Sequence, residues 1–266
     1  MLAIFSNSDK LFSMRSRSIP LAPRLDYAVP ALTKGLDILE ALATASTPLT
    51  LALLAKELGR GNSEIFRMAN LLEARGYIAR DPAGGYLLTL KLFQLGQSVN
   101  PTLSLVAAAR EPMREFCRKT GQECHLSMME DGQLVVLAQE FGTQAVTIRI
   151  RPGFAHNPLR TASGRLLLAI LDPEEAARHF ALARAAFPGP HPARANFFTS
   201  LKPLAKAGFA RAEGESLAGL CDVAVPLSAG SVKAALASSR FSGGLSAAEF
   251  AAWLDALRQA VADVEN

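Results

Sequence analysis

The sequence predicts an α+β protein of two domains: a helical N-terminal domain that ends in a β-hairpin, and a C-terminal domain that combines an antiparallel sheet with helices. Three observations lead to this prediction. The 266 residues provide for about two domains of ordinary size. Apolar residues recur at helical spacing in three short segments before residue 76. From residue 121 onward, strand-like segments and Gly-containing turns are typical of an antiparallel sheet.

The composition fits a globular chain with a sizeable core. Hydrophobic residues make up 50% of the chain, charged residues 20%, and the formal net charge is +4. Residues 1–100 hold the basic excess, with 11 Lys or Arg against 8 Asp or Glu, which permits phosphate binding without demonstrating it. No apolar stretch approaches the roughly 20 residues of a membrane span. The start, MLAIFSNSDKLF, has no basic region before an apolar one, so we expect neither a secretory signal nor membrane association.

Cysteine usage and the N-terminal segment bear on the compartment and on the start of the fold. The chain has three cysteines, Cys117, Cys124 and Cys221. Such a sparse, odd set is typical of a reducing compartment, so we expect a cytoplasmic protein. Residues 1–28 mix Ser, Arg and Pro without a period and predict a flexible basic arm, either a disordered tail or an arm that reaches into a minor groove. The sequence leaves both Met1 and Met14 open as the true start.

Residues 29–90 show the pattern of three helices followed by a hairpin. We expect the first helix over residues 34–44, with Thr33 as its N-cap and Leu residues along one face. The second helix begins after a cap at Thr50 and ends at a Gly-rich turn, and the third spans residues 63–75. The stretch YIARDPAGGYLLTL then predicts two short strands around a turn that contains Pro and Gly.

Two helices joined by a tight turn and followed by a hairpin form a winged helix-turn-helix, whose second helix presents its N-terminal residues to the major groove. The alternative is a structural module of three helices with solvated charges. We favour DNA binding because helix, turn, helix and hairpin occur in the required order and length. The residues expected to contact phosphates or base edges are Thr50, Lys56, Arg60, Asn62, Ser63, Glu64, Arg67, Asn70 and Arg80. For Arg67, an ion pair with an acidic neighbour inside the domain is the competing role.

The segment after the hairpin predicts a connection between domains and the first half of a sheet. Residues 91–104 predict a linker helix and residues 103–120 a further helix, and both are candidates for a dimer seam. HLSMMEDGQLVVLAQEF then predicts two strands around an Asp-Gly turn, and VTIRIRPG alternates like another strand. SGRLLLAIL predicts a buried helix.

The remaining segments predict two helices and two strands. One helix covers residues 197–209, and DVAVPL and VKAALASS predict strands around a short turn. Residues 246–264 form the last helix, which begins with a capping box of Ser246 and Glu249. We therefore expect residues 105–266 to form one domain, an antiparallel sheet covered by helices.

Several stretches carry motifs of one known family. They are VPALTKGLDILEAL with LTLALLAKELGRGNSEIFRMANLLEARGYIARDPAGGYLLTLKLFQLGQ in the first domain, and GQECHLSMMEDGQLVVLAQ, PLRTASGRLLLAIL and GFARAEGESLAGLCDVAVPLSAGSVKAALASS in the second. Over about residues 29–264 the chain resembles the IclR family of transcriptional regulators. The resemblance implies a repressor or activator that binds a double-stranded DNA operator as a homodimer or homotetramer. It also implies that residues 105–266 form a GAF- or profilin-like domain for oligomerisation and for binding a small effector, often an organic acid.

The same resemblance implies an effector site made by the Thr-Ala-Ser-Gly loop and by the last strands. The family often has Asp, Cys and two Ser residues on those strands. In this chain the corresponding positions are Ala212, Asp222 with Cys221 one place early, Ala237 and Ser239. These departures predict an effector that differs from a small acid such as glyoxylate.

Two arginines replace a Gly and a His of the family pattern, namely Arg240 and Arg160. We hypothesise that one of them pairs with an effector carboxylate, a solvated Arg being the alternative. His125 is expected either to line the effector cavity or to be a satisfied core histidine. The full set of expected effector contacts is His125, Arg160, Ala162, Ser163, Asp222, Ser239 and Arg240.

The sequence shows no pattern for catalysis or metal binding. Cys124 and His125 are adjacent on a predicted strand and therefore face opposite sides, and the other histidines lack ligand spacing. Neither a hydrolase elbow, an HExxH motif nor a Walker loop is present. We predict no enzyme, no catalytic residue, no metal and no cofactor. The alternative is a metabolite-binding or enzymatic module whose degenerate helix-turn-helix serves only dimerisation; the polar outward face of the third helix argues against it.

Overall fold

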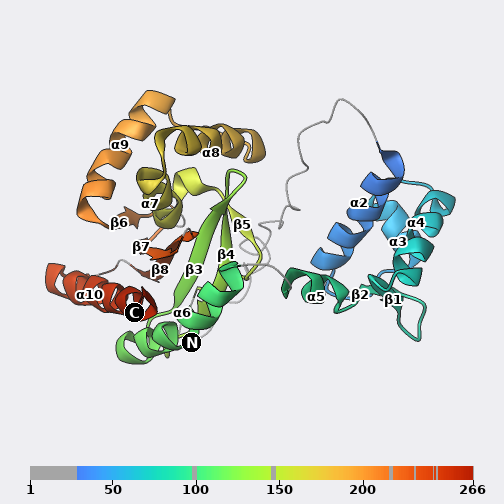
Figure 1. Ribbon diagram of the computed structural model, residues 1–266, viewed down its shortest axis with the longest axis horizontal. Coiled ribbons are helices and arrows are strands. Elements are labelled where there is room, and N and C mark those ends of the chain that lie inside the picture. The colour runs from blue at the N-terminus through green and yellow to red at the C-terminus, as the bar shows by residue number, and fades with distance from the viewer. Residues whose placement is uncertain are drawn as a thin grey trace, which may run out of the picture. The chain divides into compact units, whose positions relative to one another are not determined.

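The computed structural model divides the chain into two compact units, one ending at Val99 and the other beginning at Asn100 (Figure 1). The residues that the structure describes are 29–97, 101–144, 148–215, 218–230, 232–241, 243 and 245–265. The predicted arm at residues 1–28 lies outside them. None of the helices in these ranges combines the length and hydropathy that a membrane span requires.

The N-terminal unit consists of helices and one hairpin, as the sequence predicts. Its elements are α2 (Pro30–Thr44), α3 (Leu51–Glu57), α4 (Asn62–Ala74), β1 (Ile78–Arg80), β2 (Tyr86–Leu88) and α5 (Lys91–Gln97). β1 and β2 pair antiparallel, with Ile78 opposite Leu88. Buried Ile38 of α2, Leu54 of α3 and Ile65 of α4 meet in one apolar core. This shared core holds α2, α3, α4 and the hairpin in one arrangement.

The start of α2 differs from the prediction, and the cap of α3 agrees with it. Thr33 is not an N-cap, because α2 begins at Pro30, whose fixed φ favours the first helical position. The Thr33 hydroxyl instead donates to the carbonyl of Val29. The Thr50 side chain accepts from the backbone N–H of Leu53 at 3.4 Å, which confirms it as the cap of α3.

The C-terminal unit is built on a six-stranded antiparallel sheet with the strand order β5-β4-β3-β8-β7-β6. The strands are β3 (Cys124–Glu130), β4 (Gln133–Glu140), β5 (Ala155–His156), β6 (Ala210–Glu213), β7 (Leu220–Ala229) and β8 (Val232–Phe241). The helical elements are α6 (Pro101–Thr120), the 3-10 turn η1 (Pro158–Arg160), α7 (Ala162–Ile170), α8 (Pro173–Ala186), α9 (Arg194–Ala207) and α10 (Ala247–Glu265). The mixed helix and strand content confirms the predicted α+β class.

Helices cover both faces of this sheet (Figure 1). On one face, α6 and α10 pack over Val223, Leu236 and their neighbours, with Trp253 in the same core. On the other face, α7 lies against a floor of small residues that includes Ala212, Ala224 and Ala237. Because alanine leaves only a Cβ above the sheet, the backbone of α7 approaches this face closely.

One C-terminal prediction was wrong, and two elements were not predicted. Residues 148–150, inside the stretch VTIRIRPG, form no strand. The Gln139 side chain takes the backbone groups that a strand partner would take. Its Nε2 donates to the Ile148 carbonyl at 2.7 Å, and its Oε1 accepts from the Ile150 N–H at 2.7 Å. Helix α8, with Pro173 at its start, and the short strand β6 were both missed. The capping box is confirmed, since Ser246 N donates to Glu249 Oε2 at 2.9 Å and Glu249 N donates to Ser246 Oγ at 3.2 Å.

Candidate DNA-binding surface and effector site

Helix α4 has one face in the core and one face in solvent. Ile65 and Ala69 are buried, whereas Asn62, Ser63 and Arg67 are exposed near its N-terminal end. The turn from α3 to α4 passes through Gly59 at φ 61°, a backbone angle that favours glycine. The arrangement therefore presents the start of α4 to a partner, as a recognition helix requires. Lys56 on α3 and the Thr50 cap are exposed as well.

The predicted DNA-contacting residues fall into two groups once their partners are known. Arg67 forms no ion pair or hydrogen bond within the described part of the chain. Arg60, by contrast, pairs with Asp37 at 2.7 Å, and Glu64 pairs with Lys34 of α2. These two contacts tie α2 to the start of α4 and to the turn before it. The acidic bridge considered for Arg67 is thus made by Arg60.

The hairpin between β1 and β2 is held firmly at its tip. Asp81 Oδ1 accepts from the N–H groups of Ala83 at 3.0 Å and of Gly85 at 2.7 Å. Arg80 pairs with Glu73 at 3.1 Å and donates to Asn70 Oδ1 at 3.2 Å. Both predicted DNA contacts in this region, Asn70 and Arg80, therefore have partners inside the domain and fix the hairpin against α4.

The register of the sheet in the C-terminal unit brings several predicted effector residues onto one face. Asp222 lies opposite Ser239 in the β7–β8 pair, and His125 lies opposite Ala237 in the β3–β8 pair. Alternate residues of a strand share a face, so all four lie on the side that α7 covers. His125, Asp222 and Ser239 are each less than 9% exposed.

The start of α7 adds the loop residues to the same side of the sheet. Ala162 and Ser163 are buried in the first turn of α7. The Thr161 side chain caps this helix by accepting from the Gly164 N–H at 3.2 Å. A Cβ on Gly164 would lie 2.5 Å from the carbonyl oxygen of Pro158, so only glycine allows η1 and α7 to approach this closely.

The two arginines hypothesised to bind a carboxylate are not among the buried residues on the α7 side of the sheet. Arg160 ends η1 and is exposed. The guanidinium of Arg240 lies over the indole ring of Trp253, 5.8 Å from its centroid. Trp253 belongs to the core on the α6 and α10 side of the sheet. The guanidinium of Arg240 thus contacts Trp253 of α10. Arg240 also lines a cleft that is described below.

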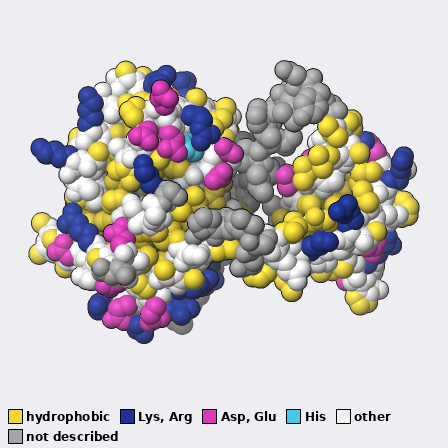
Figure 2. Space-filling view, viewed as in Figure 1, with side chains coloured by type: hydrophobic (Ala, Val, Ile, Leu, Met, Phe, Trp, Pro, Cys, Tyr) yellow, Lys and Arg dark blue, Asp and Glu magenta, His cyan; other side chains and the backbone are white. Residues whose placement is uncertain are grey.

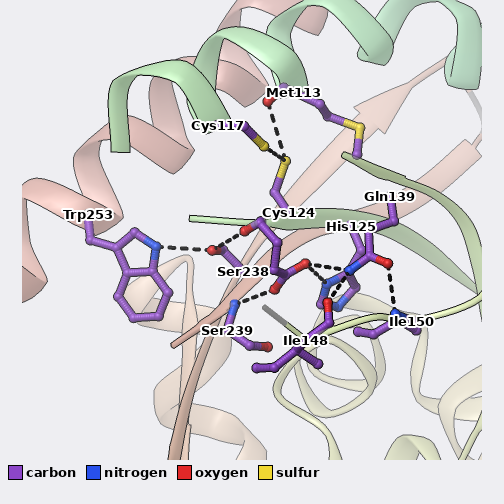
Figure 3. Close-up of polar contacts among 11 residues, drawn as sticks. Met113, Cys117, Cys124, His125, Gln139, Ile148, Ile150, Ser238, Ser239 and Trp253 are labelled. Carbon is purple, nitrogen blue, oxygen red and sulfur yellow. Dashed lines mark hydrogen bonds and ion pairs between the residues drawn. The ribbon is translucent and has the colours of Figure 1, made fainter. Parts of the chain in front are cut away.

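Sequence reasoning missed one buried acidic residue, Glu123, which directly precedes β3; its partners His125, Gln139 and Ser239 are labelled in Figure 3. It is 3% exposed. Its Oε1 accepts from the backbone N–H of Ser239 at 2.7 Å, and its Oε2 accepts from Gln139 Nε2 at 2.9 Å and lies 3.4 Å from His125 Nδ1. The signal was present, since Glu123 is two residues before His125 and therefore shares its inward-facing parity.

A small cleft of about 180 Å³ opens beside this carboxylate. Its lining residues come from the start of β3, the end of β8 and the segment after β4: Gln122, Glu123, Gln144, Ile148, Ser239, Arg240 and Phe241. The side chain of Gln139 holds Glu123 on one side and the backbone of Ile148 and Ile150 on the other. One hydrogen-bonded network thus shapes both the floor and a wall of the cleft.

Two further polar atoms on the α7 side of the sheet lack partners among the described residues. They are Ser127 Oγ, on a fully buried residue, and His156 Nε2. Ser127 shares the face of His125, because the two pair with Ala235 and Ala237 of β8. Burial, and then the nearby His125, lower the pKa of His156. Orphaned polar atoms of this kind mark a place where a small polar ligand or water gains hydrogen bonds.

No three His, Cys, Asp or Glu side chains within the described ranges are arranged to hold a metal ion. The cysteines there are free and buried. Cys117 Sγ lies 3.7 Å from Cys124 Sγ on the α6 side of the sheet, away from the cleft (Figure 3).

A helix-turn-helix with a hairpin wing, followed by a separate domain with an antiparallel sheet, defines a two-domain DNA-binding regulator. The model of the IclR helix-turn-helix domain matches residues 31–82, and that of the bacterial transcriptional regulator IclR C-terminal domain matches residues 97–266. The chain belongs to the IclR family of bacterial transcriptional regulators. The predicted resemblance is thereby confirmed.

Known regulators support this assignment along most of the chain. XynR of Escherichia coli is 27% identical over 239 residues, which are 87% of this chain and 94% of XynR. KipR of Bacillus subtilis is 30% identical over 127 residues, so the match spans 48% of this chain and 51% of KipR. Each of these relatives is described as an HTH-type transcriptional regulator.

Solved structures share the fold. An IclR homolog from Microbacterium hydrocarbonoxydans, complexed with 4-hydroxybenzoate, has a TM-score of 0.75 at 20% identity and covers 88% of this chain and 97% of its own. A regulator from Rhodococcus has a TM-score of 0.71 at 22% identity, with 90% and 97% covered. These structures thus share the two-domain fold of this chain.

Proposed function

We propose that this regulator binds its operator through the start of α4 and the β1–β2 hairpin, and that a small organic acid bound in the C-terminal unit controls that binding. The observation that carries the proposal is the exposed Arg67, which has no partner in the described part of the chain and lies beside Asn62 and Ser63 on α4. A guanidinium in this position donates bidentately to guanine or to a phosphate. The relatives are transcriptional regulators, and the protein acts in the cytoplasm without enzymatic activity.

The ion-paired residues play a different part in this proposal. Arg60 and Glu64 orient α4 against α2, and Asn70 and Arg80 orient the wing. Lys56 and Thr50 are exposed on α3 and contact phosphates, as does Arg80 through its remaining N–H groups. Readout of base edges then falls to Asn62, Ser63 and Arg67.

Two copies of the chain bind one operator. Large apolar side chains remain exposed on the N-terminal unit, and hydrophobic surface gathers over α2 in the view of Figure 2. The exposed apolar residues of α2, α5 and their flanks are Val29, Leu32, Leu36, Leu90, Leu92, Phe93 and Leu95. An apolar surface of this kind is typical of a protein interface. A homodimer, alone or paired into a homotetramer, buries it and matches the two-fold symmetry of an operator.

The effector binds on the α7 side of the sheet. Buried polar groups without partners, Ser127 Oγ and His156 Nε2, lie on that side together with His125, Asp222 and Ser239. The Microbacterium homolog was solved with an aromatic acid, which supports an organic acid as the class of effector. Ala162 and Ser163 provide backbone N–H groups at the start of α7, and pairing of the acid with Arg160 or Arg240 remains our prediction.

A gel shift with the DNA upstream of the protein's own gene tests the operator part. We expect specific binding that weakens with salt, because each phosphate contact releases counterions. Arg67→Ala should lose about 10- to 100-fold in affinity, the effect of about 1–3 kcal/mol for one bidentate base contact. Arg75→Ala is the matched control, since Arg75 is exposed at the other end of α4 and should change affinity little.

Two outcomes contradict the proposal. Equal losses for Arg67→Ala and Arg75→Ala remove Arg67 from the interface. Absence of a specific shift at low salt favours the alternative, a metabolite-binding module whose helix-turn-helix serves only dimerisation.

A further inference from the structure

Glu123 is a buried carboxylate that forms no ion pair with a Lys or Arg side chain of the described residues. Its side chain is 2% exposed. Within ion-pair distance the described residues supply one partner, His125, which carries a charge only when protonated. Lys and Arg side chains, by contrast, pair with the carboxylates of Asp37, Glu64, Glu73 and Glu140. A buried carboxylate that lacks such a partner costs folding free energy, so a cation that arrives with a ligand gains a strong interaction there.

The carboxylate is fixed in place and keeps acceptor capacity. Ser239 N holds Oε1, and Gln139 Nε2 holds Oε2. Each carboxylate oxygen offers about two lone pairs, so one on Oε1 is left after the bond from Ser239. Because Gln139 is itself bonded to the backbone of Ile148 and Ile150, it holds the carboxylate in one position. A ligand therefore meets an oriented acceptor whose position requires no reorganisation.

The cleft beside Glu123 is small, and its lining is that of a site for a small polar molecule. Its volume is about 180 Å³. Ser239, one of the predicted effector residues, lines it together with Glu123. The amide side chains of Gln122 and Gln144 line the same cleft and offer neutral donors away from the carboxylate. The described lining thus combines one anionic acceptor with neutral donors and with one cation, Arg240, whose guanidinium lies over the ring of Trp253.

We propose that Glu123 is the residue that determines effector specificity, and that the effector is a zwitterionic organic acid whose protonated amine pairs with this carboxylate. The inference rests on the proposed effector function of the C-terminal unit. A simple carboxylic acid brings a second negative charge toward Glu123 and is repelled, whereas an amino acid brings a compensating cation. The acid group then points toward the amides of Gln122 and Gln144 and toward Arg240, which line the same cleft.

Matched ligand pairs test this proposal on the full-length protein. Titration calorimetry and thermal shift compare alanine with propionate, norvaline with valerate, and phenylalanine with 3-phenylpropionate; propylamine serves as an amine without an acid group. We expect at least one amino acid to bind at least about tenfold more tightly than its deamino partner, as one added charge contact predicts. Glu123→Gln should reduce that ratio to near one, and Glu123→Asp should retain most of it.

The control variant is Glu130→Gln, which removes an exposed carboxylate from the other end of the same strand. It should leave the ratio unchanged. Because the readout is a ratio between two ligands on one protein, moderate destabilisation by Glu123→Gln does not imitate the result. Glu123→Asp keeps the charge and covers the case in which the Gln variant fails to fold.

The outcomes separate the two proposals. If deamino acids bind as tightly as amino acids, or if Glu123→Gln keeps the preference, the inference on Glu123 fails while the organic-acid effector stands. Tight binding of propylamine alone supports pairing with Glu123 and overturns the organic acid. No ligand-dependent shift with any of these compounds overturns both.

Discussion

The two units of this regulator differ in how deeply their polar contacts are buried. In the N-terminal unit, the ion pairs Arg60–Asp37 and Arg80–Glu73 lie at or near the surface. In the C-terminal unit, a hydrogen-bonded network joins Glu123, Gln139 and Ser239 near the start of β3 and the end of β8. Surface pairs contribute little free energy and rearrange easily, whereas a buried network is costly to break. The ion pairs of the N-terminal unit are thus partly accessible to solvent, whereas the network around Glu123 is shielded from it.

The largest expected effect contrasts one glycine in each unit. Gly164→Ala should destabilise the C-terminal unit by about 3 kcal/mol or more, because its Cβ would lie 2.5 Å from the Pro158 carbonyl oxygen, where backbone must move. Urea unfolding followed by the fluorescence of Trp253, the single tryptophan, measures this loss of stability.

Gly35→Ala is the counterpart in α2, where a Cβ meets nothing within 4 Å. Helix propensity there predicts a gain of about 0.5–1 kcal/mol, read by hydrogen exchange of the N-terminal unit. Similar effects at both glycines would contradict the close approach of η1 and α7.

A middle-sized effect is expected when the buried network loses Gln139. Gln139→Leu removes the donor to Glu123 and the bonds to Ile148 and Ile150, and leaves a buried carboxylate with one donor fewer. We expect a loss of about 2–3 kcal/mol in the same urea measurement. Gln133→Leu, on the same strand, is the control, and its effect should stay within about 0.5 kcal/mol. Equal effects of the two variants would show that the network contributes no special stability.

The smallest effect concerns pH and His179 of α8. Its Nδ1 accepts from the Gly132 N–H at 2.9 Å, which requires that nitrogen to be unprotonated. Burial and then Arg178 lower the pKa of His179, while Glu175, Asp131 and Glu130 oppose the shift. A folded-state pKa below the unfolded value means that the unfolded chain binds more protons, so stability is full above about pH 6.5 and declines as the pH falls through that value.

His179→Gln tests this dependence, because the amide oxygen accepts from Gly132 without titrating. Urea unfolding at about pH 7.5 and about pH 5.5 should show a smaller acid-induced loss for the variant than for the parent chain. His156, whose pKa burial also lowers, accounts for part of the remainder. An unchanged pH dependence would mean that the Gly132 contact survives protonation.

Much of the N-terminal unit follows from the sequence. The Thr50 cap, the core positions Ile65 and Ala69, and the hairpin around the Asp81 turn all lie where local pattern predicts them. These features depend on residues close together in the chain, so periodicity and turn chemistry are sufficient. The misplaced start of α2 arose because both Thr33 and Pro30 are plausible first-turn residues, and only the helix itself shows which begins it.

The candidate effector site was predicted less well, because its residues are far apart in the chain. Glu123 and Ser239 are 116 residues apart in the chain, and they meet only because β3 pairs with β8. The segment at 148–150 alternates like a strand, yet Gln139 satisfies its backbone groups. In the same way, Arg240 looks available in the sequence and lies over Trp253 in the fold.

The sequence by itself determined the two-domain α+β organisation, the winged helix-turn-helix and the family, because these depend on short-range periodicity and contiguous motifs. The tertiary structure decided which charged groups are accessible. It left Arg67 without a partner among the described residues, engaged Arg60 and Glu64 inside the domain, and buried Glu123 beside a cleft. Accessibility and charge compensation depend on strand register and helix packing between distant segments, and local sequence patterns do not encode them.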